Sequence, residues 1–251
     1  MKAMILAAGL GTRLRPLTND RPKALVEVGG RTLLEITTAR LREFGVRELV
    51  INVHYHPAQI VDCLKNNRNF GMERVEISHE ENLLDTGGGL KKAAWFFLED
   101  SSHREEPFIL HNVDVISTID FQPMIRAHSQ NGALATLAVQ NRQTSRYLLF
   151  DQHQQLCGRR KGPRENDELV REEDKPQAVA FCGVHVISPR LLKLMNEQGA
   201  FSIIDSYLRI AGEGEPIMAF LADDYYWRDL GRPEDLAQAQ QDLKEKTLQL
   251  G

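Results

Sequence analysis

Near the amino terminus the sequence reads Lys2-Ala-Met-Ile-Leu-Ala-Ala-Gly-Leu-Gly-Thr-Arg13, and this stretch decides the fold. Residues 2–8 are apolar enough to form a central strand, and a long glycine-containing loop separates them from the next helical pattern, which begins at Leu33. Long loops at the carboxyl ends of strands are where α/β proteins bind ligands. The stretch therefore predicts a central strand of an α/β sheet, followed by a ligand-binding loop.

Strand and helix patterns alternate after this loop, which is typical of a sheet covered by helices. Further strands are predicted at 48–53, 73–78, 107–115, 133–140, 146–151, 178–187 and 216–221. Helices are predicted at 33–44, 57–67, 88–97, 189–197, 202–211 and 233–248. We expect one domain over residues 1–251, a Rossmann-like three-layer α/β/α fold with a mixed, mostly parallel central sheet. No hexapeptide repeat is found, so no C-terminal β-helix is expected.

The composition of the 251 residues, 42% hydrophobic and 26% charged, is that of an ordinary globular protein. A net charge of −4 argues against a nucleic-acid partner but leaves room for a local cationic pocket. No apolar run approaches the roughly 20 residues that span a bilayer, and the apolar amino-terminal stretch is too short for a signal peptide. We therefore predict no membrane association and a cytoplasmic location. Three cysteines form no C-x-x-C pair and receive no chemical role.

A strongly charged run interrupts the second half, because twelve of the seventeen residues from 159 to 175 are charged. Such runs are usually solvated. The run therefore predicts a solvated hairpin or a mobile loop.

The loop after the first strand combines small residues with cations. Ala7, Ala8, Gly9 and Gly11 lack bulk, so backbone N–H groups can approach a ligand. Four cations follow within eleven residues: Arg13, Arg15, Arg21 and Lys23. The third glycine of the dinucleotide fingerprint is absent, and so is the lysine-Ser/Thr pair of a P-loop. The combination predicts a polyphosphate site, with a tight turn and a solvated basic loop as the alternative. Arg15 and Arg21 are interpreted as salt-bridge partners within the loop.

The loop also carries a long motif, Leu6-Ala-Ala-Gly-x-Gly-Thr-Arg-Leu-Arg-Pro-Leu-Thr18, with Pro22-Lys23 after it. It closely resembles the signature of the sugar-1-phosphate nucleotidyltransferases. The resemblance continues in order along the chain, at Leu84-Asp-Thr-Gly-Gly-Gly-Leu90, Asp114, Phe181-Cys-Gly-Val184 and Trp227-Arg-Asp-Leu-Gly231. It implies a GT-A-like fold and an enzyme that joins a sugar 1-phosphate to the α-phosphorus of a nucleoside triphosphate. Pyrophosphate is released, and Mg²⁺ is the implied cofactor.

The resemblance implies a role for each residue that matches the motifs. Arg13 and Lys23 are the implied catalytic cations, Arg13 on the departing pyrophosphate and Lys23 on the α-phosphate or the sugar phosphate. Asp114 and Asp229 are the implied metal ligands. The implied nucleotide-binding residues are Leu6, Ala7, Ala8, Gly9, Gly11, Thr12, Arg13, Glu80, Thr86, Gly87 and Gly88. The implied sugar-phosphate residues are Asn112, Gly183 and Lys175.

Other interpretations remain open for several of these residues. An aspartate at a strand end is commonly a turn former, and a glycine inside a strand such as Gly183 can mark a bulge. Glu80 is as readily a solvated acid. Val113 stands where the family usually has a glycine, and Asp174 interrupts the family's Glu-Lys-Pro element at Lys175.

The overall pattern most resembles short uridylyltransferases that act on N-acetylmuramate 1-phosphate, and UTP is the expected nucleotide. Mannose- or heptose-1-phosphate guanylyltransferases are nearly as similar, and choline-phosphate cytidylyltransferases share the opening motif. A catalytically silent nucleotide-sugar-binding regulatory subunit is the non-enzyme alternative. The presence of Arg13, Lys23, Asp114 and Asp229 favours activity. The sugar, the base, the pathway and the oligomeric state stay open.

Overall fold

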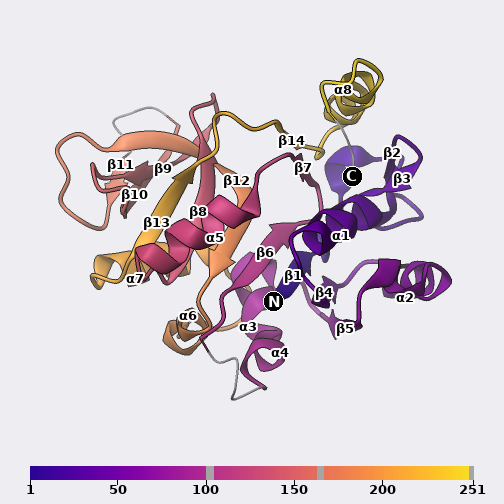
Figure 1. Cartoon of the computed structure of the whole chain (residues 1–251), viewed down its shortest axis with the longest axis horizontal. Helices are drawn as coiled ribbons and strands as arrows, with labels where there is room; N and C mark the ends of the chain where they lie inside the picture. Colours follow the sequence, from indigo (N-terminus) through magenta and orange to yellow (C-terminus); the bar gives the residue numbers. More distant parts are fainter. Residues whose placement is uncertain (100–104, 163–166, 249–251) are drawn as a thin grey trace.

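The computed structural model describes residues 1–99, 105–162 and 167–248 (Figure 1). Four parallel strands form one half of the main sheet, in the order β5 (Arg74–His79), β4 (Glu48–Val53), β1 (Lys2–Leu6) and β6 (Phe108–Asn112). β1 lies between β4 and β6, so the carboxyl end of the predicted first strand faces the middle of this edge. The predicted central strand is confirmed, and it ends at Leu6.

The other half of the sheet begins where β12 (Gln177–Ile187) pairs antiparallel with β6. β12 also pairs with β8 (Ala135–Gln140) and with β9 (Arg146–Phe150), both antiparallel. The remaining strands are β10 (Leu156–Lys161), β11 (Asp167–Leu169) and β13 (Ile217–Leu221), of which β13 runs parallel to β8. Figure 1 shows the β10–β11 hairpin and β5 at opposite ends of the sheet. The expected mixed sheet is confirmed.

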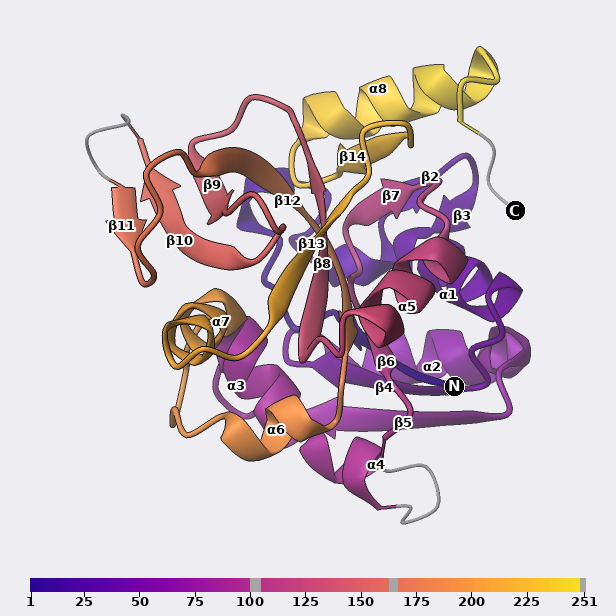
Figure 2. The ribbon, with the colours of Figure 1, turned by 60° about the vertical axis from the view of Figure 1, so that its left-hand side comes forward.

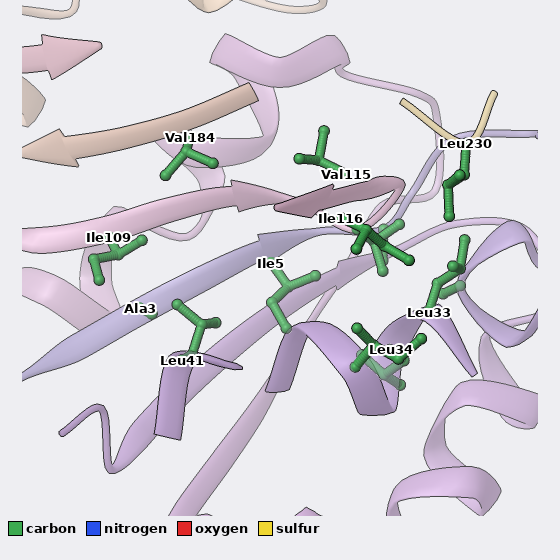
Figure 3. Packing of buried hydrophobic residues seen from close by; sticks show 14 of the residues in the cluster. Ala3, Ile5, Leu33, Leu34, Leu41, Ile109, Val115, Ile116, Val184 and Leu230 are labelled. Atoms are coloured by element: carbon green, nitrogen blue, oxygen red, sulfur yellow. The ribbon is translucent and has the colours of Figure 1, made fainter. Parts of the chain in front are cut away.

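Helices cover both faces, because neighbouring residues of each strand point to opposite sides. Ile5 packs with the helices of one face, whereas Met4 packs with those of the other. On the first face lie α1 (Leu33–Glu43), α2 (Pro57–Asn66), α5 (Phe121–Gln130) and α8 (Pro233–Lys244). On the second face lie α3 (Asp85–Lys92), α4 (Ala94–Leu98), α6 (Arg190–Leu194) and α7 (Ile203–Gly212). Figure 3 shows Ile5 between α1 and the sheet, with Leu34 and Leu41 below it. The three-layer prediction is confirmed.

Two short pairs of strands lie outside the main sheet. β2 (Glu27–Val28) and β3 (Arg31–Thr32) form a small hairpin before α1, and the Thr32 side chain caps α1 by accepting from the Glu35 N–H at 3.1 Å. β7 (Val115–Ser117) pairs antiparallel with β14 (Trp227–Asp229), which joins segments far apart in the sequence. No helix in the described ranges is long and apolar enough to cross a membrane.

Several predicted elements differ from the structure. The helix predicted at 88–97 is two helices, α3 and α4, and α3 begins already at Asp85. The strand predicted at 107–115 ends at Asn112, before β7. α5 was not predicted, and its Pro123 lies in the first turn, where a missing N–H does no harm. The charged run forms the β10–β11 hairpin through Arg159–Glu168 and Arg160–Asp167 ion pairs, although residues 163–166 lie outside the described part.

Candidate active site

The loop after β1 folds back on itself around Gly11. Gly11 has a φ of 62°, and an added Cβ there would lie 3.1 Å from both the Lys23 Cβ and the Thr18 Cγ2. The Thr18 hydroxyl donates to the Gly11 carbonyl at 2.8 Å, which closes the loop. A side chain at residue 11 would therefore be strained and crowded at once. Gly11 allows Lys23 to pack against the glycine-containing turn.

A buried hydrogen-bond chain connects this loop to the neighbouring strands. The Ala7 N–H donates to Asn52 Oδ1 at 2.7 Å, and Asn52 Nδ2 donates to Glu80 Oε1 at 2.8 Å. The other Glu80 oxygen accepts from the Leu84 N–H at 2.9 Å. Asn52 is 2% exposed and Glu80 is 1% exposed, so the alternative of a solvated acid is wrong. Asn52 was missed because no local motif marks a residue whose role depends on two distant partners.

These bonds give Glu80 a positioning role, since both of its oxygens already accept hydrogen bonds inside the protein. They fix the start of the 84–88 segment relative to the phosphate loop. A direct contact of Glu80 with the nucleobase stays a prediction.

The 84–88 segment is itself held against residues 201–203. The N–H groups of Gly87 and Gly88 donate to the Phe201 carbonyl, at 2.9 and 3.3 Å. The Thr86 hydroxyl accepts from the Ile203 N–H at 3.0 Å. Gly87 is buried against the Phe201 ring and Gly88 against the Gly199 carbonyl, so both glycines have a packing reason as well as the predicted nucleobase contact.

Pairing of β7 with β14 brings the two predicted metal aspartates together. Asp229 lies opposite Val115 in this ladder, and the Leu230 N–H donates to the Asp114 carbonyl at 2.7 Å. Figure 2 shows β14 alongside β7, next to α8. The Lys23 ammonium donates to Asp114 Oδ2 in an ion pair that is mostly buried. Residues from the phosphate loop, the end of β6 and the far end of the chain thus meet.

The electrostatics of Asp229 suit a bound cation. Burial raises the pKa of this carboxyl, and the neighbouring Asp114 carboxylate raises it further. The charges of Lys23 and Arg13 and the Gly231 N–H, which donates to Asp229 Oδ1 at 2.6 Å, act in the opposite direction. Mg²⁺ prefers oxygen ligands and is commonly held by one or two carboxylates together with phosphates and waters. The two carboxylates fit such an ion.

Arg13 reaches the same place from the phosphate loop. A Cβ built on Gly231 would lie 2.6 Å from Arg13 Nη2 and 2.6 Å from Asp229 Oδ1, so both groups lie against this glycine. The structure therefore brings together the four residues that were predicted to carry the chemistry: Arg13, Lys23, Asp114 and Asp229. Their catalytic and metal-binding roles stay predictions.

The remaining loop residues divide by exposure. Ala7 and Ala8 are buried, and the Leu6 carbonyl accepts from the Val113 N–H at 3.2 Å. Gly9 and Thr12 are exposed, and an added Cβ at Gly9 would meet no atom within 4 Å.

Arg21 pairs with Asp20 at 3.8 Å, which confirms its interpretation as a salt-bridge partner, whereas no described ion pair includes Arg15.

A cavity of about 860 Å³ opens beside these residues, lined in part by Arg13, Asn112, Gly183 and Asp229. Gly183 has a φ of 73° at an irregularity in β12, and a Cβ there would lie 2.8 Å from Asn112 Nδ2. The sugar-phosphate residues Asn112 and Gly183 are thus adjacent, and the bulge interpretation of Gly183 is confirmed as well.

Lys175 does not line this cavity. It precedes the start of β12, and the six steps from residue 177 to 183 span about 20 Å of strand.

The sequence did not predict that Arg142 and Trp227 line this cavity. The Arg142 guanidinium lies 3.7 Å from the centre of the Trp227 ring and donates from Nη2 to the Phe181 carbonyl at 2.7 Å. Burial lowers the pKa of Arg142. Trp227 was noted only as part of the frame around Asp229, and no motif included Arg142.

Comparison with known families agrees with this site. Residues 2–246 match the model of the family described as nucleotidyl transferase, so the chain belongs to the nucleotidyl transferase family. It is 32% identical over 249 residues to the N-acetylmuramate alpha-1-phosphate uridylyltransferase of Caulobacter vibrioides, covering 97% of each chain. It is 31% identical over 242 residues to the mannose-1-phosphate guanyltransferase of Emericella nidulans, covering 94% of this chain. The chain spans 62% of the length of that guanyltransferase.

Solved structures share the fold over nearly the whole chain. HddC from Yersinia pseudotuberculosis, complexed with GMP-PN, superposes with a TM-score of 0.74 at 22% identity, covering 96% of this chain and 99% of HddC. UDP-glucose pyrophosphorylase complexed with UDP-glucose superposes with a TM-score of 0.78 at 17% identity, covering 98% of both chains. At these identities the likeness supports the fold.

Proposed function

We propose that this protein is a sugar-1-phosphate nucleotidyltransferase that uses a nucleoside triphosphate and releases pyrophosphate. The observation that carries the proposal is the convergence of Arg13, Lys23, Asp114 and Asp229, of which Arg13 and Asp229 line a cavity of about 860 Å³. In the reaction, a phosphate oxygen of the sugar 1-phosphate attacks the α-phosphorus and forms the new P–O bond. The bond from the α-phosphorus to the bridging oxygen breaks, and pyrophosphate leaves with that electron pair.

The chemistry needs alignment and charge neutralisation more than a proton-abstracting base, because the nucleophile is already an anion at neutral pH. Arg13 holds the departing β- and γ-phosphates, for which its planar fork of donors is suited. Lys23, a compact charge held by Asp114, serves the α-phosphate and the approaching sugar phosphate. A magnesium ion held by Asp114 and Asp229 would neutralise phosphate oxygens when bound. Asn112 and Gly183 border the sugar side.

For the substrates we propose UTP with an N-acetylmuramate 1-phosphate-like sugar. The uridylyltransferase of Caulobacter vibrioides supports this choice, because the match covers 97% of both chains. The alternative is a mannose- or heptose-1-phosphate guanylyltransferase, which the relative from Emericella nidulans favours at nearly the same identity. The cytoplasmic location stays a prediction.

The test is to incubate the protein and Mg²⁺ with each nucleoside triphosphate and a panel of sugar 1-phosphates, and to follow pyrophosphate. The panel contains N-acetylmuramate, mannose and heptose 1-phosphates, and choline phosphate is added as a further acceptor. Pyrophosphate released only when both substrates are present supports the proposal. Nucleotide-sugar binding without turnover would support the regulatory alternative, and a kcat/KM for GTP equal to or above that for UTP would overturn the choice of base.

A further inference from the structure

Arg142 is fixed on the wall of the cavity next to Gly183. Its Nη2 donates to the Phe181 carbonyl at 2.7 Å, and its guanidinium lies on the Trp227 ring at 3.7 Å. The Trp227 indole N–H donates in turn to the Cys182 carbonyl at 2.7 Å. The two side chains are therefore tied to consecutive carbonyls of β12, immediately before Gly183. A guanidinium held in this way loses little freedom when it binds a ligand.

Burial lowers the pKa of Arg142 and the charge of Asp229 acts in the opposite direction, but no ion pair among the described residues neutralises the guanidinium. Three other arginines of the same cavity have carboxylate partners: Arg159 pairs with Glu168 and Asp205, Arg160 with Asp167, and Arg228 with Asp242. Arg142 has no ion pair with any carboxylate of the described residues, and its buried Nε has no hydrogen-bond acceptor there. The nearby Cys182 thiol stays uncharged, because burial raises its pKa to about 12.

A desolvated guanidinium with unused donors favours an anion, above all a phosphate or carboxylate that matches its planar donor fork. The position decides which anion this is. The proposed triphosphate site lies along the loop after β1, whereas Arg142 lies by β12, beside the glycine on the sugar side. Lys175, the cation implied for the sugar phosphate, does not line the cavity.

We propose that Arg142, stacked on Trp227, binds the phosphate of the sugar 1-phosphate and thereby takes the part that the family resemblance implied for Lys175. This inference rests on the proposed function. Arg142 supplies a cation, in addition to Lys23, for a nucleophile that must approach an anionic triphosphate. Trp227 is a positioning residue in this arrangement, since it acts through the guanidinium.

The test compares Arg142→Gln and Arg142→Lys with the wild type and with Arg126→Gln, a control at an exposed position on α5. Steady-state kinetics would use the best nucleotide and sugar 1-phosphate of the wild type, with each varied in turn. We expect Arg142→Gln to raise the KM for the sugar 1-phosphate by at least about 30-fold while the KM for the nucleotide changes less than about threefold. Arg142→Lys should fall between, because it keeps the charge and loses the fork. Lys175→Gln should leave both KM values within about twofold.

Trp227→Phe adds a readout that a general loss of structure would not give. It keeps the ring and removes the indole N–H, so we expect the KM for the sugar 1-phosphate to rise several-fold at an unchanged KM for the nucleotide. Equal rises in both KM values, or a KM for the sugar 1-phosphate that responds to Lys175→Gln and not to Arg142→Gln, would overturn the inference.

Failure of the proposed function is recognised separately, as absence of pyrophosphate from the wild type with every substrate pair. The binding of mannose 1-phosphate and N-acetylmuramate 1-phosphate, followed by thermal shift, then decides about Arg142. A wild-type shift that Arg142→Gln abolishes and Arg126→Gln retains supports the inference. A shift that Arg142→Gln retains, or no shift for the wild type, contradicts it.

Discussion

Gly231 offers a perturbation that reaches two functional groups at once. Its φ lies outside the left-handed region, so Gly231→Ala is allowed by the backbone, but the new Cβ would lie 2.6 Å from both Arg13 Nη2 and Asp229 Oδ1. An ordinary carbon–oxygen contact is about 3.3 Å, so each group must move by about 0.7 Å. Misplacement by about 1 Å costs on the order of a hundredfold in rate, so we expect a displacement of about 0.7 Å to lower kcat about 25-fold.

The same substitution should cost little stability, because Arg13 is exposed and its guanidinium can rotate away. We expect the Tm of Gly231→Ala to stay within about 3 °C of the wild type, while the rate loss corresponds to about 2 kcal/mol of transition-state stabilisation. The assay is pyrophosphate release at saturating substrates, together with thermal unfolding. Gly212→Ala, at the end of α7 and outside the cavity, is the matched control and should keep wild-type kcat. A wild-type kcat for Gly231→Ala would refute the placement of Arg13 and Asp229 in the working enzyme.

Three further predictions concern charge. Asp114→Asn and Asp229→Asn should each lower kcat at least about a hundredfold with little change in Tm, and excess chelator should abolish wild-type activity; full activity in any of these cases would exclude the metal assignment. Arg13→Lys should mainly lower kcat, whereas Lys23→Ala should mainly raise the KM for the sugar 1-phosphate; kinetics with both substrates varied would detect the reverse pattern. Burial lowers the pKa of His128 to about 4, so the unfolded chain takes up a proton first as the pH falls from about 6.5. The free energy of unfolding that is lost between pH 7 and pH 5 should therefore be about 2 kcal/mol smaller in His128→Gln than in the wild type, as measured by urea unfolding. An equal loss in both proteins would show that His128 does not cause this pH dependence.

Most of the fold could be predicted from local patterns. The apolar run at β1 and the strand at Glu48–Val53 were predicted nearly to the residue, because buried parallel strands are continuous apolar segments. α5 was missed because its buried side chains are few, mainly Phe121 and Met124, and its proline resembles a helix breaker. The charged run was expected to be a solvated hairpin or a mobile loop, and β10 and β11 form a hairpin. Its register could not be predicted, since it depends on which arginine pairs with which acid.

The residues of the site also differ in whether a local motif could predict them. Arg13, Lys23, Asp114 and Asp229 belong to contiguous motifs, so they could be predicted before any pairing was known. Asn52 could not, because its role requires partners on two neighbouring segments. Arg142 also depends on tertiary structure, since it follows β8 and is held by β12 and β14. Lys175 belongs to a motif as well, but the structure does not place it on the wall of the cavity, so its contact with the sugar phosphate stays a prediction.

The junction between the two halves of the sheet explains why both substrates are expected to meet there. β6 is the last strand of the parallel half, and its carboxyl end carries Asn112, with Asp114 just after it. β12 runs antiparallel beside it and brings Gly183 against Asn112. Parallel strands direct their carboxyl ends and following loops to one edge, which suits the triphosphate, whereas the antiparallel neighbour presents the middle of its backbone to that edge. We therefore expect the sugar phosphate to approach from the β12 side and the pyrophosphate to leave on the β1 side, because the strand direction reverses between them.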